Sequence, residues 1–251
     1  MWKIALIASS ALALAALPSN AQWKTPWTYD GERGAEHWGA LDPDYAACNA
    51  GHAQSPVDIK GAVKRPLPPL GFDYHAGPVS LINNGATAVR VDYPRGTGDL
   101  LKVGDRIYAL TQFHFHHPSE ETLNGQVFAM TLHLMHASAD GRVAGVAIFL
   151  KPGKANPVVQ ALWDQMAGTP GPSRPIPGLS VDPSALLPAG RGYYAYQGSQ
   201  TAPPCTEGVQ WFVLKTPIEV SPAQIEAFAR IYPHDVRPVQ PLNGRVIEES
   251  E

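Results

Sequence analysis

The sequence is poor in charged residues and gathers neither sign into a run or patch. Lys and Arg together number 19, Asp and Glu together number 22, and the formal net charge is −3. Binding to nucleic acid or to a membrane surface depends on clustered basic residues, so the sequence disfavours both classes of partner. Outside an N-terminal stretch the chain also lacks an apolar run of membrane-spanning length, which argues against a transmembrane anchor.

Internal repeats and abrupt shifts of composition are absent as well, so nothing marks a boundary between domains. Helix signals are few, whereas 23 glycines and 25 prolines separate short runs of strand-like sequence. Such runs occupy residues 88–93, 100–103, 106–110, 143–150 and 209–216. The pattern predicts a single, mainly β domain with a few short helices on its periphery.

Two helix starts carry capping sequences. Asn156 precedes Pro157 and an apolar stretch, and Ser221 precedes Pro222, with Gln224 placed to complete a capping box. Residues 168–188 contain so many prolines and glycines that we expect an ordered surface connection there.

The first 21 residues have the layout of a secretory signal peptide. Lys3 is the one early charge, an Ala/Leu-rich run follows over residues 4–17, and small residues stand at the −3 and −1 positions of a cut after Ala21. The run is too short for a stable transmembrane span. The sequence therefore predicts a signal peptide at residues 1–21, a domain at residues 22–251, and export to the periplasm or the medium.

Only two cysteines are present, Cys48 and Cys205. In an exported chain the surroundings are oxidising, so a disulfide is the favoured use, and closing this long loop would contribute about 3–5 kcal/mol. Two free buried thiols are the alternative.

Five of the nine histidines lie between residues 114 and 136. In the first run, His114 and His116 alternate with Phe113 and Phe115. Residues i and i+2 of a strand share a face, so the two histidines should point one way, and the two phenylalanines and His117 the opposite way.

A second strand-like run, residues 129–137, continues this pattern. Thr131, His133 and Met135 share one face of it. Between the two runs, Asn124-Gly125 is a strong turn signal that favours antiparallel pairing of the two strands.

His114, His116 and His133 can therefore converge on one point. Three neutral imidazoles with an open fourth position form the ligand set of a catalytic zinc ion, which makes these residues the predicted metal ligands. An isolated strand histidine is more often a half-buried polar residue without a ligand. This is the interpretation for His117 and His136, which fall on the other faces.

The spacing His114-x-His116-x-x-x-Glu120 also fits the metal motif of cupins, in which the glutamate is itself a ligand. Cupins require glycines at set distances on either side, and the absence of those glycines leaves the match weak.

A second resemblance extends over nearly the whole chain after residue 35. The sequence resembles the α-class carbonic anhydrases in a series of motifs that occur in the family's order: Glu36-His37-Trp38-Gly39, Gln54-Ser-Pro-Val-Asp-Ile59, Asn83-Asn-Gly85, Gln112-Phe-His114-Phe-His116, Pro118-Ser-Glu120, Leu132-His133-Leu134, Ile148-Phe-Leu-Lys151, Gly198-Ser199 with Thr201, Pro203-Pro-Cys205-Thr-Glu-Gly-Val209-x-Trp211 and Arg237-Pro-x-Gln-Pro-Leu-Asn-Gly-Arg245. Secreted bacterial members place their disulfide where Cys48 and Cys205 lie.

The resemblance implies a large, twisted, mostly antiparallel central sheet with zinc at the floor of a conical cleft. His114, His116 and His133 would bind Zn²⁺, and water or hydroxide would complete the coordination. Thr201 would accept a hydrogen bond from the hydroxide and donate its own proton to Glu120. The implied reaction is the reversible hydration of CO₂ to bicarbonate and a proton, so the implied partner is a small-molecule substrate.

Departures from the family begin around the zinc site. Gln112 is in place to accept a hydrogen bond from His114, as in the family. The family's glutamate two residues before the third ligand is Thr131 here. A neutral hydroxyl should hold the His133 ring less firmly, so zinc retention should be about 10–100-fold weaker. The shuttle histidine after Asn-Asn-Gly is replaced by Ala86, which predicts slow turnover.

Further departures line the cleft. The substrate-pocket positions map to Met135, Gly145, Gln200, Ala202, Val209 and Trp211. Gly145 replaces a customary valine, and Gln200 replaces an apolar residue. Ala202 stands for a polar residue and Ala40 for a tyrosine. So many substitutions in one cleft imply altered kinetics or a different ligand.

Three functional classes remain open at this point. The first is a working carbonic anhydrase, and the second is a non-catalytic relative that uses the fold for binding. The third is a zinc-dependent esterase of small esters, in a cleft widened by Gly145, Ala202 and Ala40. Binding relatives have usually lost a zinc ligand, whereas none is lost here. The sequence leaves both a monomer and a homodimer possible.

Overall fold

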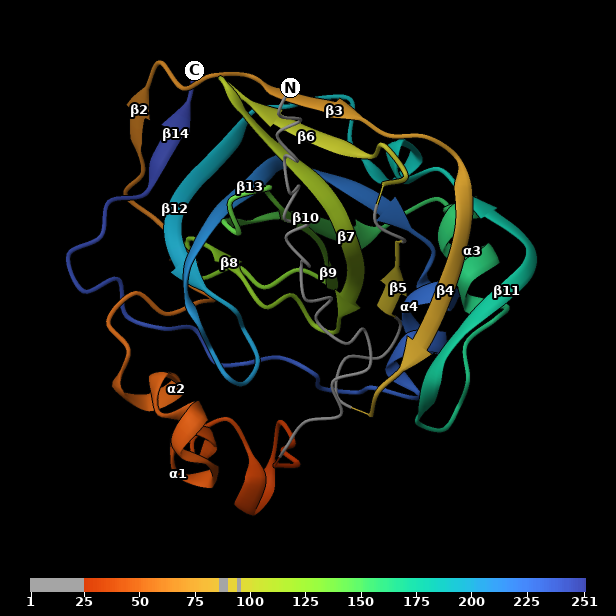
Figure 1. Cartoon of the computed structure of the whole chain (residues 1–251), viewed down its shortest axis with the longest axis horizontal. Helices are drawn as coiled ribbons and strands as arrows, with labels where there is room; N and C mark the ends of the chain where they lie inside the picture. The colour runs from red at the N-terminus through yellow and green to blue at the C-terminus, as the bar shows by residue number, and fades with distance from the viewer. Residues whose placement is uncertain (1–24, 86–89, 94–95) are drawn as a thin grey trace, which may run out of the picture.

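The computed structural model describes residues 25–85, 90–93 and 96–251 (Figure 1). The predicted signal peptide at residues 1–21 and the predicted shuttle position, Ala86, lie outside this part of the chain. Within it, no helix combines the length and the apolar character needed to cross a membrane.

Strands dominate the described chain, and 12 of them form one large sheet (Figure 1). At one place the sheet branches, where β6 (Leu100–Val103) pairs with β7 and carries β3 (Leu70–Asp73). The main path across the sheet runs through β11 (Gly171–Val181), β4 (Gly77–Asn83), β5 (Arg90–Asp92), β7 (Arg106–His116), β9 (Met130–Ala137), β10 (Val143–Pro152), β13 (Glu207–Val220), β12 (Tyr193–Ser199), β14 (Glu248–Ser250) and β2 (Val63–Arg65).

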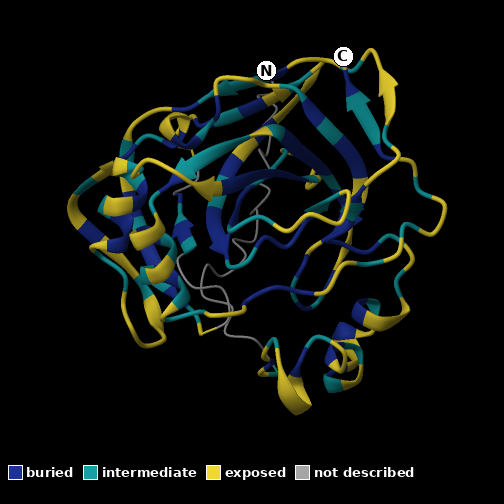
Figure 2. Cartoon of the chain, turned by 180° about the vertical axis from the view of Figure 1, so that it is seen from behind, coloured by how far each residue is buried: buried dark blue, intermediate teal, exposed yellow. Residues whose placement is uncertain are grey.

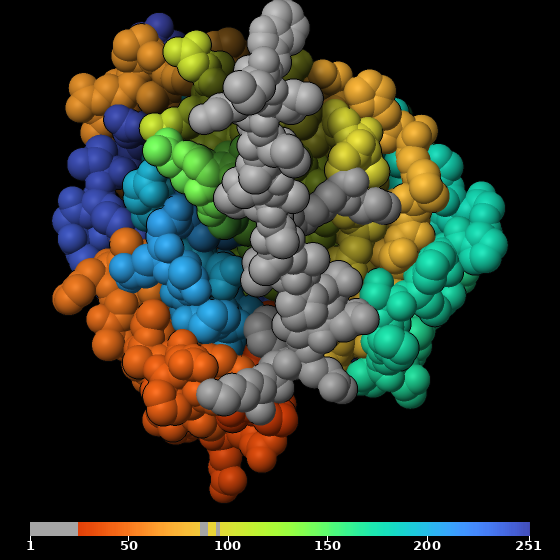
Figure 3. Space-filling model, viewed as in Figure 1, coloured from red at the N-terminus to blue at the C-terminus, as the bar shows by residue number. Residues whose placement is uncertain are grey.

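Neighbouring strands of this sheet are antiparallel except for two pairs, β10 with β13 and β14 with β2. A separate parallel pair joins β1 (Asp58–Ile59) to β8 (Thr122–Leu123). The prediction of a mainly β domain with a mostly antiparallel sheet is confirmed. Figure 3 shows the C-terminal residues (blue) lying against the orange segment that contains β2, as the β14–β2 pairing requires.

The two faces of the sheet bury different sets of side chains. One face carries the larger core, to which β7 contributes Phe113 and Phe115 and β9 contributes Leu132 and Leu134. The opposite face carries a smaller cluster that includes Trp211. Burial on both faces makes the central strands almost continuously buried (Figure 2). Alternation along β7 and β9 then directs their intervening histidines to the face of the smaller cluster.

The helices are short and lie outside the sheet (Figure 1). Near the N-terminus are η1 (Gly31–Arg33), α1 (Trp38–Leu41), η2 (Pro43–Tyr45) and α2 (Ala47–Ala50), and later in the chain come α3 (Pro157–Trp163), η3 (Pro183–Leu186) and α4 (Pro222–Ala229). The buried apolar side chains of α3 and α4 belong to the larger core, so these two helices cover that face of the sheet.

Both predicted helix starts are confirmed. The Asn156 side chain accepts hydrogen bonds from the backbone N–H groups of Val158 and Val159 at the start of α3. Ser221 and Gln224 form the complete capping box at the start of α4.

The expected ordered surface segment over residues 168–188 is mostly exposed, but it is not a mere connection, because about half of it forms β11, which pairs with β4 at the edge of the sheet. The pairing is interrupted between Gly171 and Arg174 and again between Pro175 and Ser180. An edge strand needs hydrogen bonds along one side only, so it tolerates prolines that would break a central strand.

Asn124 and Gly125 form the predicted tight turn, with φ values of 51° and 77°. The turn closes a local bridge and does not join β7 to β9 directly. The two strands are nevertheless antiparallel neighbours, with His114 directly opposite His133. Cys48 and Cys205 form the predicted disulfide, with an S–S distance of 2.04 Å.

His136 is buried on the face of the larger core, away from the other histidines of β7 and β9. Its Nε2 atom lies 2.6 Å from the Tyr74 hydroxyl and its Nδ1 atom 3.3 Å from the Ala144 carbonyl oxygen. Burial lowers the pKa of His136 to about 4, although the hydrogen bond to the Ala144 carbonyl acts in the opposite direction. The ring is therefore neutral in the folded protein near pH 7.

This neutral ring predicts an acid-sensitive stability. Below pH 6.5 the unfolded chain binds a proton at His136 before the folded chain does, so the stabilisation present above pH 6.5 is lost as pH falls towards 4. The loss from this group amounts to about 3 kcal/mol. Urea unfolding of wild type and His136→Gln at several pH values measures it. The variant should show the shallower pH dependence, and equal dependence in the two proteins would contradict the assignment.

Candidate metal centre

His114, His116 and His133 meet on the face of the sheet that carries the smaller cluster. His114 and His116 are two residues apart on β7, and His133 lies opposite His114 on β9. One ring nitrogen from each lies within 4.8 Å of the others, and all three residues are buried. The structure thus brings together the three predicted ligands.

Oxygen acceptors hold the outer side of each ring. The Nδ1 atom of His114 lies 2.8 Å from Oε1 of Gln112, and that of His116 lies 2.7 Å from the Asp235 carbonyl oxygen. For His133 the contact is through Nε2, which lies 3.0 Å and 3.1 Å from the two carboxylate oxygens of Glu121. Because these oxygens can only accept, each contacting nitrogen carries the hydrogen.

The opposite nitrogen of each ring is then left with a free lone pair. The Nε2 atom of His116 and the Nδ1 atom of His133 are buried and make no hydrogen bond. Two such unpartnered nitrogens beside a third imidazole are costly unless a cation binds there. Three neutral imidazoles held from outside by hydrogen bonds match the ligand set of zinc, so the residues present fit this metal.

The protonation of the three rings follows from their surroundings. Burial lowers the pKa of His114 and of His116 well below the ordinary histidine value, and mutual repulsion among the rings lowers both further. Burial also acts to lower the pKa of His133, but the facing Glu121 carboxylate, together with Glu120, outweighs burial and raises that pKa. Glu121 is therefore the dominant charge acting on the third ring.

Glu120 lies on the inner side of the same cluster. Its Oε2 atom is 3.5 Å from Nε2 of His116 and 3.9 Å from Nδ1 of His133, and its Oε1 accepts from the backbone N–H of Arg237 at 2.9 Å. Burial raises the pKa of Glu120 to about 7, while the nearby His133 and a hydrogen bond from the Thr201 hydroxyl lower it. Thr201 therefore lies close enough to Glu120 to influence the pKa of its carboxyl group.

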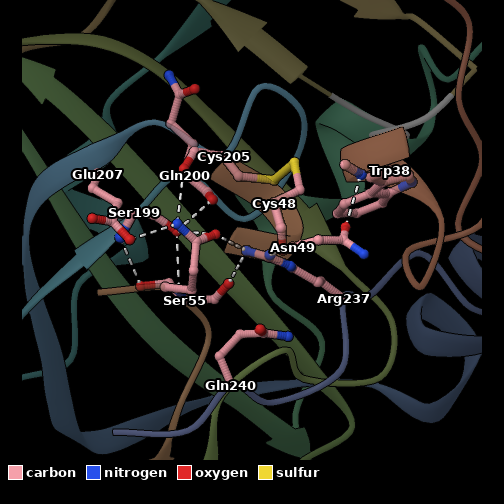
Figure 4. Close-up of a disulfide and its surroundings, with 12 residues drawn as sticks. Trp38, Cys48, Asn49, Ser55, Ser199, Gln200, Cys205, Glu207, Arg237 and Gln240 are labelled. Carbon is pink, nitrogen blue, oxygen red and sulfur yellow. Dashed lines mark hydrogen bonds between the residues drawn. A yellow bond between two sulfur atoms is a disulfide. The ribbon is translucent and has the colours of Figure 1, made fainter. Parts of the chain in front are cut away.

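A buried hydrogen-bond network supports the loop that carries Thr201 (Figure 4). Ser55 and Ser199 bond reciprocally, each hydroxyl accepting from the other's backbone N–H at 3.0 Å. The Arg237 guanidinium donates to Oε1 of Gln54 and to the carbonyl oxygens of Ser55 and Cys48 at 2.8, 2.8 and 2.6 Å. Since the backbone of Arg237 also holds Glu120, one residue links the disulfide region to the site.

The sequence-based interpretation of Thr131 is wrong in one respect. Thr131 does stand on β9 two residues before His133, but the ring is not left with a neutral acceptor, because the Glu121 carboxylate contacts it. The Thr131 hydroxyl instead accepts from the backbone N–H of Glu120 at 3.2 Å. The argument for weak zinc retention therefore loses its premise.

Gly145 does not widen the cleft, contrary to the expectation from sequence. Met135, Gly145 and Trp211 lie side by side across β9, β10 and β13. A Cβ atom placed on Gly145 would lie 2.6 Å from Cε3 and Cζ3 of Trp211, so the indole ring already fills the space of the missing side chain. The ring also lies 4.7 Å from that of His133, and its Nε1 donates to the Ser199 carbonyl oxygen at 3.0 Å.

The other predicted pocket residues fall in different surroundings. Val209 is buried in the same cluster as Trp211, whereas Ala202 packs against the N-terminal cluster that includes Trp38 and the disulfide. Gln200 is exposed, and its backbone N–H donates to the Thr206 carbonyl oxygen.

Sequence reasoning missed three residues around the site. The first is Glu121, whose signal was a second carboxylate directly after Glu120. The second is Asp235, which acts through a backbone carbonyl and leaves no signal in its side chain. The third is Arg90, which lies directly opposite His114 in the β5–β7 pairing and forms an ion pair with Asp92 at 2.8 Å. Opposite residues share a face, so Arg90 lies on the face of the ligands.

Comparison with known proteins identifies relatives over almost the whole chain. The sequence model of the eukaryotic-type carbonic anhydrases matches residues 33–251. A carbonic anhydrase of Nostoc is 42% identical over 89% of this chain and 86% of its own length, and one of Klebsiella pneumoniae is 41% identical over 98% and 100%. The α-carbonic anhydrase of Thermovibrio ammonificans, solved with sulfanilamide, superposes with a TM-score of 0.85 at 40% identity, covering 90% of this chain and 99% of that one.

The matches by sequence and the match by structure therefore point to the same family. The chain belongs to the eukaryotic-type, or α-class, carbonic anhydrase family.

The contact between Gly145 and Trp211 predicts a steric conflict. Gly145→Ala should lower the free energy of unfolding by about 1–3 kcal/mol, because the new methyl group must displace the buried indole. Gly77→Ala is a matched control, since Gly77 also lies in a strand but a Cβ there meets nothing within 4 Å. Urea unfolding measures both variants. Equal stability of Gly145→Ala and wild type would show that the ring has room to move.

Proposed function

We propose that this protein is a zinc-dependent carbonic anhydrase that reversibly hydrates CO₂ to bicarbonate and a proton. The observation that carries the proposal is the convergence of three imidazole nitrogens whose outer sides are all held by oxygen acceptors. Membership of the carbonic anhydrase family supports the same activity. Bound at these nitrogens, Zn²⁺ would supply a hydroxide nucleophile by lowering the pKa of water to about 7, an effect for which carbonic anhydrase is the standard example.

The chain's own residues orient the reaction. We assign the Thr201 hydroxyl as a hydrogen-bond donor to the Glu120 carboxyl group, because it lies close enough to lower the pKa of that group. Its oxygen then offers only lone pairs to the cleft, so Thr201 accepts a hydrogen bond from a nucleophile there and does not donate one. Glu120 is fixed in turn by the Arg237 backbone N–H. This chain of hydrogen bonds directs a lone pair of the nucleophile towards CO₂.

Catalysis without a shuttle histidine is the second part of the proposal. With Ala86 at the shuttle position, the proton leaves directly to water. A proton recombines with a group of pKa near 7 with an association rate constant of at most about 10⁹–10¹⁰ M⁻¹s⁻¹. Release of the proton to water is therefore limited to roughly 10²–10³ s⁻¹. The fast reference case of carbonic anhydrase reaches about 10⁶ s⁻¹. External buffer should therefore accept the proton.

Export to the periplasm or the medium is also proposed. The supporting observations are the disulfide between Cys48 and Cys205 and the signal-like composition of residues 1–21. The narrow packing around Gly145 and Trp211 removes one reason to favour an esterase with a widened cleft.

Stopped-flow CO₂ hydration of purified protein with one zinc per chain tests the activity. The kcat should rise steeply as the concentration of imidazole-type buffer increases. A kcat that does not change with buffer would contradict direct proton release to water. Bound zinc without hydration at any buffer concentration would favour the binding-protein alternative.

A second test concerns the orienting hydroxyl. Thr201→Val keeps the shape of the side chain but removes the hydroxyl, so kcat/KM should fall by about 100-fold, a typical loss for a group that positions a proton. Zinc content should stay at one per chain, because Thr201 is not a ligand. Thr206→Val, at an exposed threonine of the same loop, is the matched control. A similar loss in both variants would point to a disturbed loop.

A further inference from the structure

The third histidine of the centre is held by a carboxylate from an unexpected place in the chain. Both carboxylate oxygens of Glu121 contact Nε2 of His133, at 3.0 Å and 3.1 Å, and both side chains are fully buried. A hydrogen bond to a charged acceptor is stronger than one to a neutral group. The contact fixes the hydrogen on Nε2 and leaves the lone pair on Nδ1, the nitrogen that faces the other two ligands.

The backbone around Glu121 is held on both sides. On one side, the Ser119 hydroxyl donates to the Glu121 carbonyl oxygen at 2.8 Å and accepts from the Phe128 backbone N–H at 2.9 Å. On the other side, Thr122 begins β8, and its hydroxyl donates to Asp58 at 2.7 Å. The carboxylate therefore reaches His133 from a fixed loop.

Thr131 serves a complementary role. It is fully buried, lies opposite His116 in the β7–β9 pairing, and accepts from the backbone N–H of Glu120. A glutamate at this position would bring a second buried carboxylate to the ring that Glu121 already contacts. Two like charges beside one N–H group repel each other, so the small neutral side chain fits the presence of Glu121.

We propose that Glu121 is the positioning residue for the third zinc ligand, and that Glu121 and Thr131 are an exchanged pair. The carboxylate that the family places two residues before this ligand has moved to the loop after β7, and position 131 has become neutral. The inference rests on the proposed zinc site. It predicts that zinc binding depends on one carboxylate at either position, but not on both.

Zinc affinity measured by competition with a chromophoric chelator tests the proposal. Glu121→Gln keeps the size of the side chain and removes its charge, so it should weaken zinc binding by about 10–100-fold. Glu120→Gln is the matched control, because it removes the adjacent buried carboxylate, which touches the inner side of the rings. This control should bind zinc within a few-fold of wild type even though its catalysis is impaired.

The exchange itself is tested by two further variants. Thr131→Glu alone should weaken zinc binding, because it crowds two carboxylates around His133. The double variant E121Q/T131E should bind zinc more tightly than E121Q, because it restores a single carboxylate beside the ring. Should E121Q not fold, the comparison of T131E with the double variant carries the test. A double variant that binds zinc no better than either single variant would overturn the exchange.

Two other measurements distinguish a positioning role of Glu121 from a purely structural one. The visible spectrum of the Co²⁺-loaded protein reports the geometry of the ligands, and it should change in E121Q but return towards wild type in the double variant. Urea unfolding of the metal-free proteins shows whether stability changes in parallel. Unchanged zinc affinity and an unchanged Co²⁺ spectrum in E121Q, with only lower stability, would overturn the positioning role. Wild type that fails to bind one zinc per chain would instead contradict the proposed function.

Discussion

The structure depends on the requirement that three buried imidazoles direct their lone pairs to one point. A histidine ring can turn over or exchange its hydrogen between nitrogens, so burial alone does not fix the direction of the lone pair. Here each ring has an oxygen acceptor on its outer side: an amide at Gln112, a backbone carbonyl at Asp235 and a carboxylate at Glu121. Without its acceptor, a ring could carry its hydrogen on the nitrogen that should offer a lone pair to the metal.

The large sheet is what makes such an arrangement rigid. Strands β7 and β9 lie in its middle, buried on both faces, so their side chains cannot relax by moving the backbone. Gln112 belongs to β7 itself, whereas Asp235 ties β7 to the C-terminal segment and Glu121 ties β9 to the loop before β8. Arg237 extends this connection to the disulfide and to the loop of Thr201. The site is therefore held by covalent and hydrogen-bonded links from most of the chain.

Sequence reasoning succeeded where the information is local. Alternation in β7 and β9 placed the ligand histidines on one face, and the caps at Asn156 and Ser221 were correctly read because a cap lies within three residues of its helix. Sequence reasoning failed where a contact joins segments that are distant in the chain, and where the shape of the site depends on which side chain fills a space. Gly145 considered alone predicts a wider cleft. The Trp211 indole that fills this space lies on another strand, β13, so the sequence around Gly145 gives no sign of it. Residues 171–181 form an edge strand because β4, a distant segment of the chain, offers them a partner.

The case of Thr131 shows why a site should be compared by chemical groups as well as by sequence positions. A missing carboxylate at position 131 predicts a weakly held ring, and this follows correctly if the rest of the site is unchanged. The loop after β7, however, brings the Glu121 carboxylate to Nε2 of His133. In the proposed exchange, what matters for His133 is a carboxylate acceptor on Nε2, whichever position in the chain supplies it. In that proposed exchange, two substitutions that each look damaging alone preserve the site when they occur together.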